Sequence, residues 1–111
     1  MAAEGAQQYR WTFGAGEFDE AKQELRIDGK AVRIEPKPLK LFGLLLRNAG
    51  EVVTREEIQA EVWDDRVTVA NTIPTAVGKL RKVLDQRCSI RIETVPRSGY
   101  RLTGQVEGIA E

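Results

Sequence analysis

Histidine, cysteine and long apolar runs are absent or scarce in this 111-residue chain, and each gap excludes a class of protein. Without histidine there is no common general base or metal ligand, and no Ser–His or Cys–His catalytic pair. The single cysteine, Cys88, cannot form an internal disulfide, and we interpret it as an inert small residue rather than a reactive thiol. No apolar run approaches the roughly 18–20 residues of a membrane span.

The composition that remains is that of one folded domain. Hydrophobic residues make up 41% of the chain and charged residues 31%, which favours a globular domain over a disordered one. No signal peptide opens the chain, so we expect a cytoplasmic location, while a longer protein could still be anchored through another segment. The carboxylates between Glu51 and Asp65 look like a solvated helix face, so we expect no enzymatic activity, no cofactor and no metal site.

The first third of the chain predicts a small antiparallel sheet. Residues 1–8 are small and polar without a period, and we interpret them as a loose, disordered tail. Residues 9–13 alternate between aromatic and polar side chains, which is typical of a half-buried strand. Two more alternating runs, 25–27 and 32–34, flank Asp28-Gly29, a two-residue hairpin signal.

Two helices are predicted in the middle of the chain. Leucine and phenylalanine recur at helical spacing over residues 37–48, just after two prolines that are tolerated in a first turn. The second helix opens at Thr54 and runs to about Trp63. Thr54 and Glu57 have capping-box spacing, in which each side chain bonds the backbone amide of the other residue.

A third helix and a hairpin complete the predicted elements. The helix is capped by Asn71 or Thr72 and runs to about Leu84. Pro74 falls in its first turn, where the missing N–H removes no intrahelical bond. The hairpin spans residues 90–102, and between the second and third helices we expect a loop over residues 64–70.

Positive charge is concentrated in the third helix and the hairpin. The whole chain balances 17 Lys/Arg against 17 Asp/Glu, but residues 71–101 hold seven basic residues and two acids. This local excess predicts an electropositive face, whose commonest large partner is a phosphate backbone.

The third helix has two distinct sides at 100° per residue. Its apolar stripe is the predicted core contact (Ile73, Val77, Leu80, Leu84). The opposite side carries small, hydrogen-bonding or basic residues (Asn71, Thr75, Gly78 and Lys82). Thr72 and Lys79 flank this side on one edge, and Arg81 flanks it on the other. Such a side fits the roughly 12 Å major groove of DNA. Basic residues on an outer helix face are commonly only solvated, so that alternative stays open for the helix alone.

The hairpin strengthens the interpretation. Arg97-Ser98 lies at its tight turn and can project into a neighbouring groove, while Arg91 and Arg101 can face phosphates. A helix followed at once by a basic hairpin is a winged helix-turn-helix arrangement.

Three strings in order, GEVVTREEIQAEVW from Gly50, NT-x(7)-LRKVL from Asn71 and IETVPRSGYRL from Ile92, resemble the OmpR/PhoB-type winged helix DNA-binding domain. The TVPRSGYRL ending is most similar to the CadC/ToxR-like branch. The resemblance implies an α+β fold with an N-terminal four-stranded antiparallel sheet, three helices and a C-terminal β-hairpin wing. It covers about residues 9–103, which leaves 104–111 as a C-terminal tail or the start of a linker. The family joins this module to sensory or effector domains, often in two-component phosphorelay systems.

The resemblance also implies residue roles. The third helix would enter the major groove and Arg97 the adjacent minor groove, so the expected DNA-binding residues are Asn71, Thr72, Thr75, Lys79, Arg81, Lys82, Thr94, Arg97, Ser98, Tyr100 and Arg101. For Tyr100 the rival role is core packing under the wing, and Trp63 is expected to be mainly structural. The 64–70 loop matches a segment that can meet RNA polymerase in activators, or it is a plain connection. A dimer on DNA is a further expectation.

The chain departs from the family pattern within the third helix. Pro74 and Gly78 stand where many members carry an acidic and a basic residue, and Ala76 replaces a position that is often polar. The outward face is therefore expected to be poor in base-reading groups, so that specificity rests on the wing, DNA shape or dimerisation. The leading hypothesis is the DNA-binding domain of a bacterial transcriptional regulator. The alternative is a winged-helix protein-interaction module without sequence-specific DNA binding.

Overall fold

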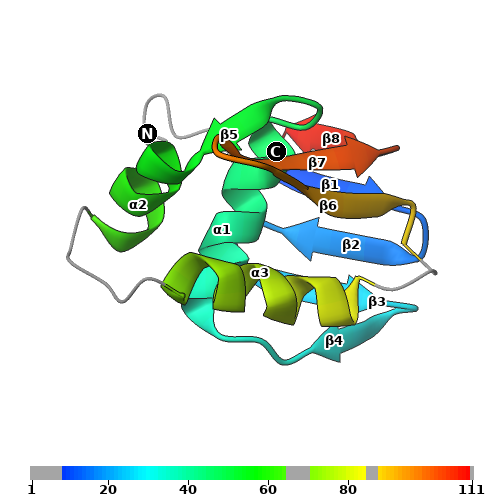
Figure 1. The fold of residues 1–111 in the computed structure, drawn as a ribbon. Coiled ribbons are helices and arrows are strands. Elements are labelled where there is room, and N and C mark those ends of the chain that lie inside the picture. The colour runs from blue at the N-terminus through cyan, green and yellow to red at the C-terminus, as the bar shows by residue number, and fades with distance from the viewer. Residues whose placement is uncertain (1–8, 65–70, 85–87, 111) are drawn as a thin grey trace, which may run out of the picture.

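The computed structural model describes residues 9–64, 71–84 and 88–110, and these form two antiparallel sheets and three helices (Figure 1). The predicted tail, residues 1–8, lies outside them. The elements in chain order are β1 (Tyr9–Phe13), β2 (Gly16–Asp19), β3 (Glu24–Ile27), β4 (Lys30–Val32), α1 (Pro36–Arg47), β5 (Val52–Thr54), α2 (Arg55–Trp63), α3 (Thr72–Val83), β6 (Ile90–Val95), β7 (Gly99–Gly104) and β8 (Glu107–Ala110).

The predicted N-terminal sheet is present, with strand order β4-β3-β2-β1-β8 and all pairs antiparallel. The Asp28-Gly29 hairpin signal is confirmed. Both residues have positive φ, 56° and 79°, which is the signature of a two-residue type I′ turn. Ile27 and Lys30 close the turn as partners across β3 and β4.

The fifth strand corrects the sequence prediction. Residues 107–110 were assigned to a tail or linker, and four strands were expected, but β8 pairs with β1 along its free edge. Trp11 lies opposite Gly108, and a Cβ on that glycine would come within 2.5 Å of the indole ring. The glycine thus lets the ring of Trp11 lie flat over β8, an arrangement that no local sequence pattern announces.

A second, smaller sheet has the order β5-β7-β6. The hairpin of β6 and β7 was predicted, whereas β5 was not. β5 is only three residues long, and Val53 in its centre is buried. Its partner β7 lies more than forty residues later in the chain, so the pairing is visible only in the fold.

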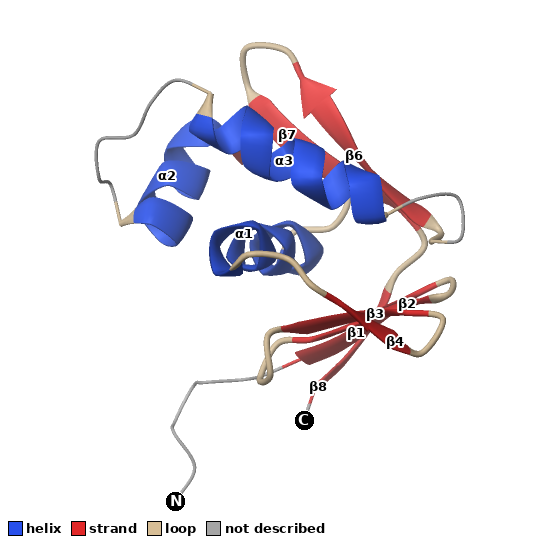
Figure 2. Cartoon of the chain, turned by 90° about the horizontal axis from the view of Figure 1, so that it is seen from below, coloured by secondary structure: helices blue, strands red, loops and turns tan. Residues whose placement is uncertain are grey.

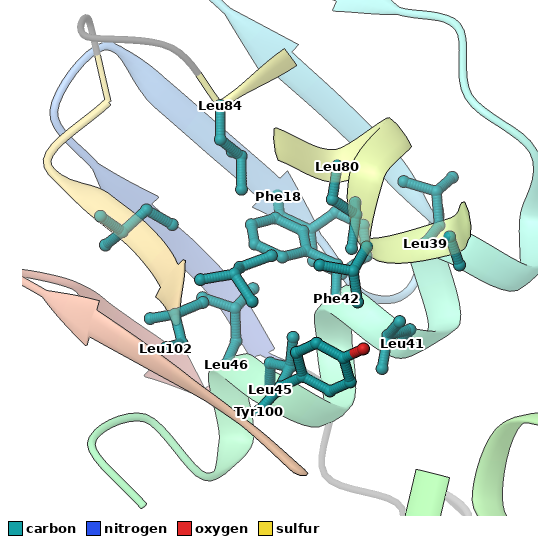
Figure 3. Packing of buried hydrophobic residues seen from close by; sticks show 14 of the residues in the cluster. Phe18, Leu39, Leu41, Phe42, Leu45, Leu46, Leu80, Leu84, Tyr100 and Leu102 are labelled. Atoms are coloured by element: carbon teal, nitrogen blue, oxygen red, sulfur yellow. The ribbon is translucent and has the colours of Figure 1, made fainter. Parts of the chain in front are cut away.

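Helix α1 lies between the N-terminal sheet on one side and α3 with the β6–β7 hairpin on the other (Figure 2). Its buried side chains fill the centre of the core, where they meet Phe18, Leu80, Tyr100 and Leu102 (Figure 3). These side chains are Leu39, Leu41, Phe42, Leu45 and Leu46, and Pro38 is also buried in the first turn. None of the helices in the described part of the chain is long and apolar enough to cross a membrane.

The predicted helices agree with the structure to within one residue at each end. The capping box of α2 is confirmed, since Thr54 Oγ1 accepts from the Glu57 amide at 3.0 Å and Glu57 Oε1 accepts from the Thr54 amide at 2.9 Å. Asn71 is the N-cap residue of α3, but its side chain makes no capping hydrogen bond.

A buried carboxylate pins the N-terminal sheet to the end of α1. Glu20 is 8% exposed and accepts hydrogen bonds from the Tyr9 amide, the Trp11 indole and the Arg47 guanidinium at 2.8–3.0 Å. Arg47 also lies 5.8 Å from the centre of the Tyr9 ring, a cation–π contact. Burial alone would raise the pKa of Glu20, but the hydrogen bonds from Arg47, Trp11 and Tyr9 outweigh it and lower that pKa below its ordinary value.

Replacing Glu20 with glutamine is expected to lower the free energy of unfolding by about 1–3 kcal/mol, because a charged acceptor with several donors is lost. Chemical denaturation measures the change. The matched control is Glu17→Gln, which removes an exposed ion pair with Arg10 and is expected to cost roughly 0–1 kcal/mol. Equal losses of unfolding free energy in the two variants would show that the buried Glu20 stabilises the fold no more than an exposed ion pair does.

The stability that Glu20 contributes should depend on pH. Its folded pKa is depressed, so its contribution is complete above the unfolded pKa of about 4.3 and is lost as pH falls through the folded pKa. The stability difference between the wild type and Glu20→Gln is therefore expected to narrow as denaturation is measured from pH 6 towards strongly acidic pH. A difference that stays constant over that range would contradict the assignment.

Candidate nucleic-acid interface

The two predicted sides of α3 are present in the structure. All four residues of the apolar stripe are buried (Ile73, Val77, Leu80, Leu84). On the opposite side Asn71, Thr75 and Lys82 are exposed. Because the stripe fixes the helix against α1, the exposed side points away from the core and is available to a partner.

One of the three departures from the family pattern looks different in the structure. Ala76 is 4% exposed and packs in the core, so it removes nothing from the outward face, contrary to the prediction. Pro74 occupies the third position of α3, in the first turn, as predicted. Gly78 does lie outward, and a Cβ there would meet open space. No packing contact within the described chain therefore requires this glycine.

The two edges of α3 carry cations that are bound within the domain. On one edge, Lys79 Nζ forms an ion pair with the Glu35 carboxylate, which precedes α1. On the other edge, the Arg81 guanidinium donates to the Ile92 carbonyl at 2.8 and 3.1 Å and to Thr94 Oγ1 at 2.9 Å. Arg81 was predicted to enter the major groove, whereas here it is turned toward β6 and joins the helix to the wing.

The tip of the wing has an unusual backbone. The Ser98 amide donates to the Val95 carbonyl at 3.0 Å, and Arg97 has φ 67°. Pro96 followed by a residue with positive φ is the pattern of a type II turn, whose third position favours glycine or asparagine. An arginine in this left-handed conformation costs about 1–2 kcal/mol, and such strained residues gather at functional sites.

The wing tip is anchored to the start of α2. The Arg55 amide donates to the Ser98 carbonyl at 3.4 Å. Gly99 lies so close to β5 that a Cβ would come within 2.0 Å of the Val53 carbonyl oxygen. This close approach holds the turn that carries Arg97 and Ser98, both of which are exposed.

Three of the remaining predicted residues lie on the wing, and two lie on the helices. Tyr100 is 3% exposed and packs in the core. The structure therefore shows its packing role, and its ring is not exposed for the predicted contact with DNA. Arg101 lies on the other face, where its guanidinium donates to Glu93 at 2.9 and 3.1 Å. Thr94 is exposed beside Arg81, and Thr72 is partly exposed at the start of α3. Trp63 packs against the core, as expected.

The structure therefore brings together one small polar surface. It consists of the outward side of α3 and the wing tip (Asn71, Thr75, Gly78, Lys82, Arg97, Ser98), which we call the α3–wing surface. In Figure 2 the tip of the hairpin rises beyond α3 on the side that faces away from α1. Sequence reasoning missed Glu35, which is 44 residues from Lys79 in the chain and has no local signal that links the two.

The family described as "Transcriptional regulatory protein, C terminal" matches residues 29–102. The chain belongs to this family. The resemblance to the OmpR/PhoB-type domain is thereby confirmed, and so is the α+β winged helix fold that it implied. The match spans the region from the β3–β4 turn to the end of the wing, so it includes the whole α3–wing surface.

Individual relatives agree with the family assignment. The chain is 34% identical over 86 residues to the transcriptional regulatory protein CutR of Streptomyces coelicolor, covering 77% of this chain and 39% of CutR. It is 30% identical over 82 residues to the transcriptional activator CadC of Escherichia coli K12, covering 71% of this chain and 16% of CadC. The solved DNA-binding domain of E. coli CadC has a TM-score of 0.77 and 26% identity, covering 94% of this chain and 100% of that one. The chain thus spans well under half the length of these curated relatives.

Replacing Arg97 with glycine should stabilise this family member by about 0.5–1 kcal/mol, because glycine adopts the left-handed conformation without the penalty that a side chain carries. Thermal and chemical denaturation measure the gain. Arg97→Ala is the matched control, since it removes the same charge but keeps the backbone penalty, and no gain is expected from it. If both variants are equally stable, the turn carries no strain that glycine relieves.

Proposed function

We propose that this chain is the DNA-binding domain of a bacterial transcriptional regulator, with α3 in the major groove and the wing tip at the adjacent minor groove. The observation that carries the proposal is the α3–wing surface. It combines a helix side free of bulky apolar groups with an exposed arginine held in a strained turn, at a hairpin tip that rises beyond α3 (Figure 2). Family membership and the DNA-binding domain of CadC support it.

Each part of the surface has a distinct role in the proposal. Lys82 contacts phosphate or guanine, while Asn71 and Thr75 are suited to adenine and to a thymine methyl group or phosphate. Gly78 leaves room for the helix backbone to approach the DNA closely. Arg97 enters the minor groove, which is narrow over A·T tracts and has there a strong negative potential that attracts arginine.

The engaged cations have a supporting role. Arg81 holds the wing against α3, so that both enter their grooves as one unit. Arg101 is bound by Glu93 on the far face of the hairpin and contributes less to phosphate binding than its charge suggests. We therefore propose fewer phosphate contacts than the number of basic residues in the third helix and the hairpin would suggest.

Binding to duplex DNA is expected to weaken steeply with salt, because phosphate contacts release counterions. Fluorescence anisotropy between 50 and 200 mM salt, on duplexes selected from genomic fragments, measures the slope. Arg97→Ala is expected to weaken binding by about 1–3 kcal/mol if it reads a base edge, and Lys82→Ala to reduce the salt slope by about 1 if it binds phosphate.

Lys22→Ala, in the turn between β2 and β3, is the matched control and should leave both quantities close to wild type. An affinity independent of salt, with no effect of Lys82→Ala or Arg97→Ala, would contradict the proposal. That result would favour the alternative, a winged-helix protein-interaction module.

Two further predictions extend to the whole protein. The predicted RNA polymerase contact falls on the 64–70 loop, of which residues 65–70 lie outside the described residues. Dimerisation on DNA likewise stays a prediction. We include both in the proposal as roles of a longer regulator, to be tested once the operator is known.

A further inference from the structure

The Glu35–Lys79 ion pair has no structural task that the fold explains. Glu35 is the N-cap residue of α1, but its side chain makes no capping hydrogen bond. Its carboxylate reaches across to Lys79 on α3, the helix whose outward side is the proposed DNA contact. The side chain of Glu35 is 63% exposed and that of Lys79 44% exposed, so the pair lies at the surface and adds little to stability.

The pair does change the charge that DNA would meet. Lys79 stands beside the α3–wing surface, one residue from Gly78, where the backbone is open to close approach. With Glu35 bound to it, its positive charge is locally cancelled. Any phosphate that approaches the ammonium group also approaches a carboxylate, and like charges at this distance repel.

We propose that Glu35 competes with DNA for Lys79 and so lowers the affinity of this domain for duplex DNA; this rests on the proposed function. Lys79 must leave Glu35 before it can bind DNA. On a random duplex the ammonium group gains only a phosphate, which merely replaces the carboxylate it gave up. On a duplex with a guanine in reach of Lys79, the ammonium group gains a base contact as well. The cost of releasing Lys79 from Glu35 is the same on both duplexes, so the ion pair lowers both affinities by a similar factor.

The test is Glu35→Gln, which keeps the size of the side chain and removes its charge. Binding to a random-sequence duplex and to a selected duplex is measured by fluorescence anisotropy from 50 to 200 mM salt. For the random duplex, affinity at the lowest salt is expected to rise roughly 3- to 10-fold and the salt slope to steepen by up to about 0.9, the value of one added phosphate contact. The selected duplex is expected to gain by a similar factor, because the cost of releasing Lys79 from Glu35 no longer opposes either complex.

Two controls separate the ion pair from a general change in charge. Glu107→Gln makes the same change in net charge on β8, on the opposite side of the molecule from α3 (Figure 2), and is expected to leave the slope unchanged. In a Lys79→Gln background, Glu35→Gln is expected to have little effect, because its partner is gone.

The outcomes are distinct. If the wild type binds no duplex, the proposed function fails and this inference fails with it. If the wild type binds in a salt-dependent way but Glu35→Gln has no effect, only the inference is overturned. It is also overturned if Glu35→Gln weakens binding, or if the effect persists in the Lys79→Gln background.

Discussion

The burial of α1 is the constraint on which the other elements depend. Its leucine and phenylalanine side chains face the N-terminal sheet on one side and α3 with β7 on the other. The ring of Phe42 packs edge-on against that of Phe13, with 5.5 Å between the ring centroids, and tilted against that of Phe18, with 5.3 Å between them. Helix and sheet thus share one aromatic cluster. Polar contacts fix the two ends of α1, through Arg47 with Glu20 and through Lys37, which donates to a carbonyl at the end of α2. An apolar helix enclosed in this way gives α3 a rigid base.

Rigidity on the inner side of α3 leaves its outer side free of any packing requirement. The helix is held by its apolar stripe, so the residues that face outward can be small, polar or even glycine without loss of the fold. The wing is held by Arg81 of α3, which donates to a carbonyl of β6, and by the Arg55 amide at the start of α2, which donates to the Ser98 carbonyl. Basic residues in this domain therefore serve two purposes. Arg81 and Arg47 are part of the scaffold, while Lys82 and Arg97 are exposed for a partner.

Sequence predicted the parts of the fold that local chemistry determines. The capping box of Thr54 and the Asp28-Gly29 turn follow from short-range hydrogen bonding and backbone preference, and the α3 stripe follows from helical periodicity. Strands β5 and β8 were missed because each is short and gains its stability from a partner far away in the chain. The ion pair of Glu35 with Lys79 and the contacts of Arg81 were missed for the same reason. Ala76 was misplaced because a helix in contact with both α1 and β6 buries a wider arc than a single stripe suggests.

The central claim is that α3 and the wing tip form one surface that binds DNA. Amide chemical shifts recorded by NMR, while a selected duplex is added to the domain, test it most directly. The account predicts that the largest changes fall on Asn71, Thr75, Gly78, Lys82 and the Arg97–Ser98 turn, with β8 and the β2–β3 turn nearly unchanged. Changes confined to the N-terminal sheet, with α3 and the wing tip unaffected, would contradict it.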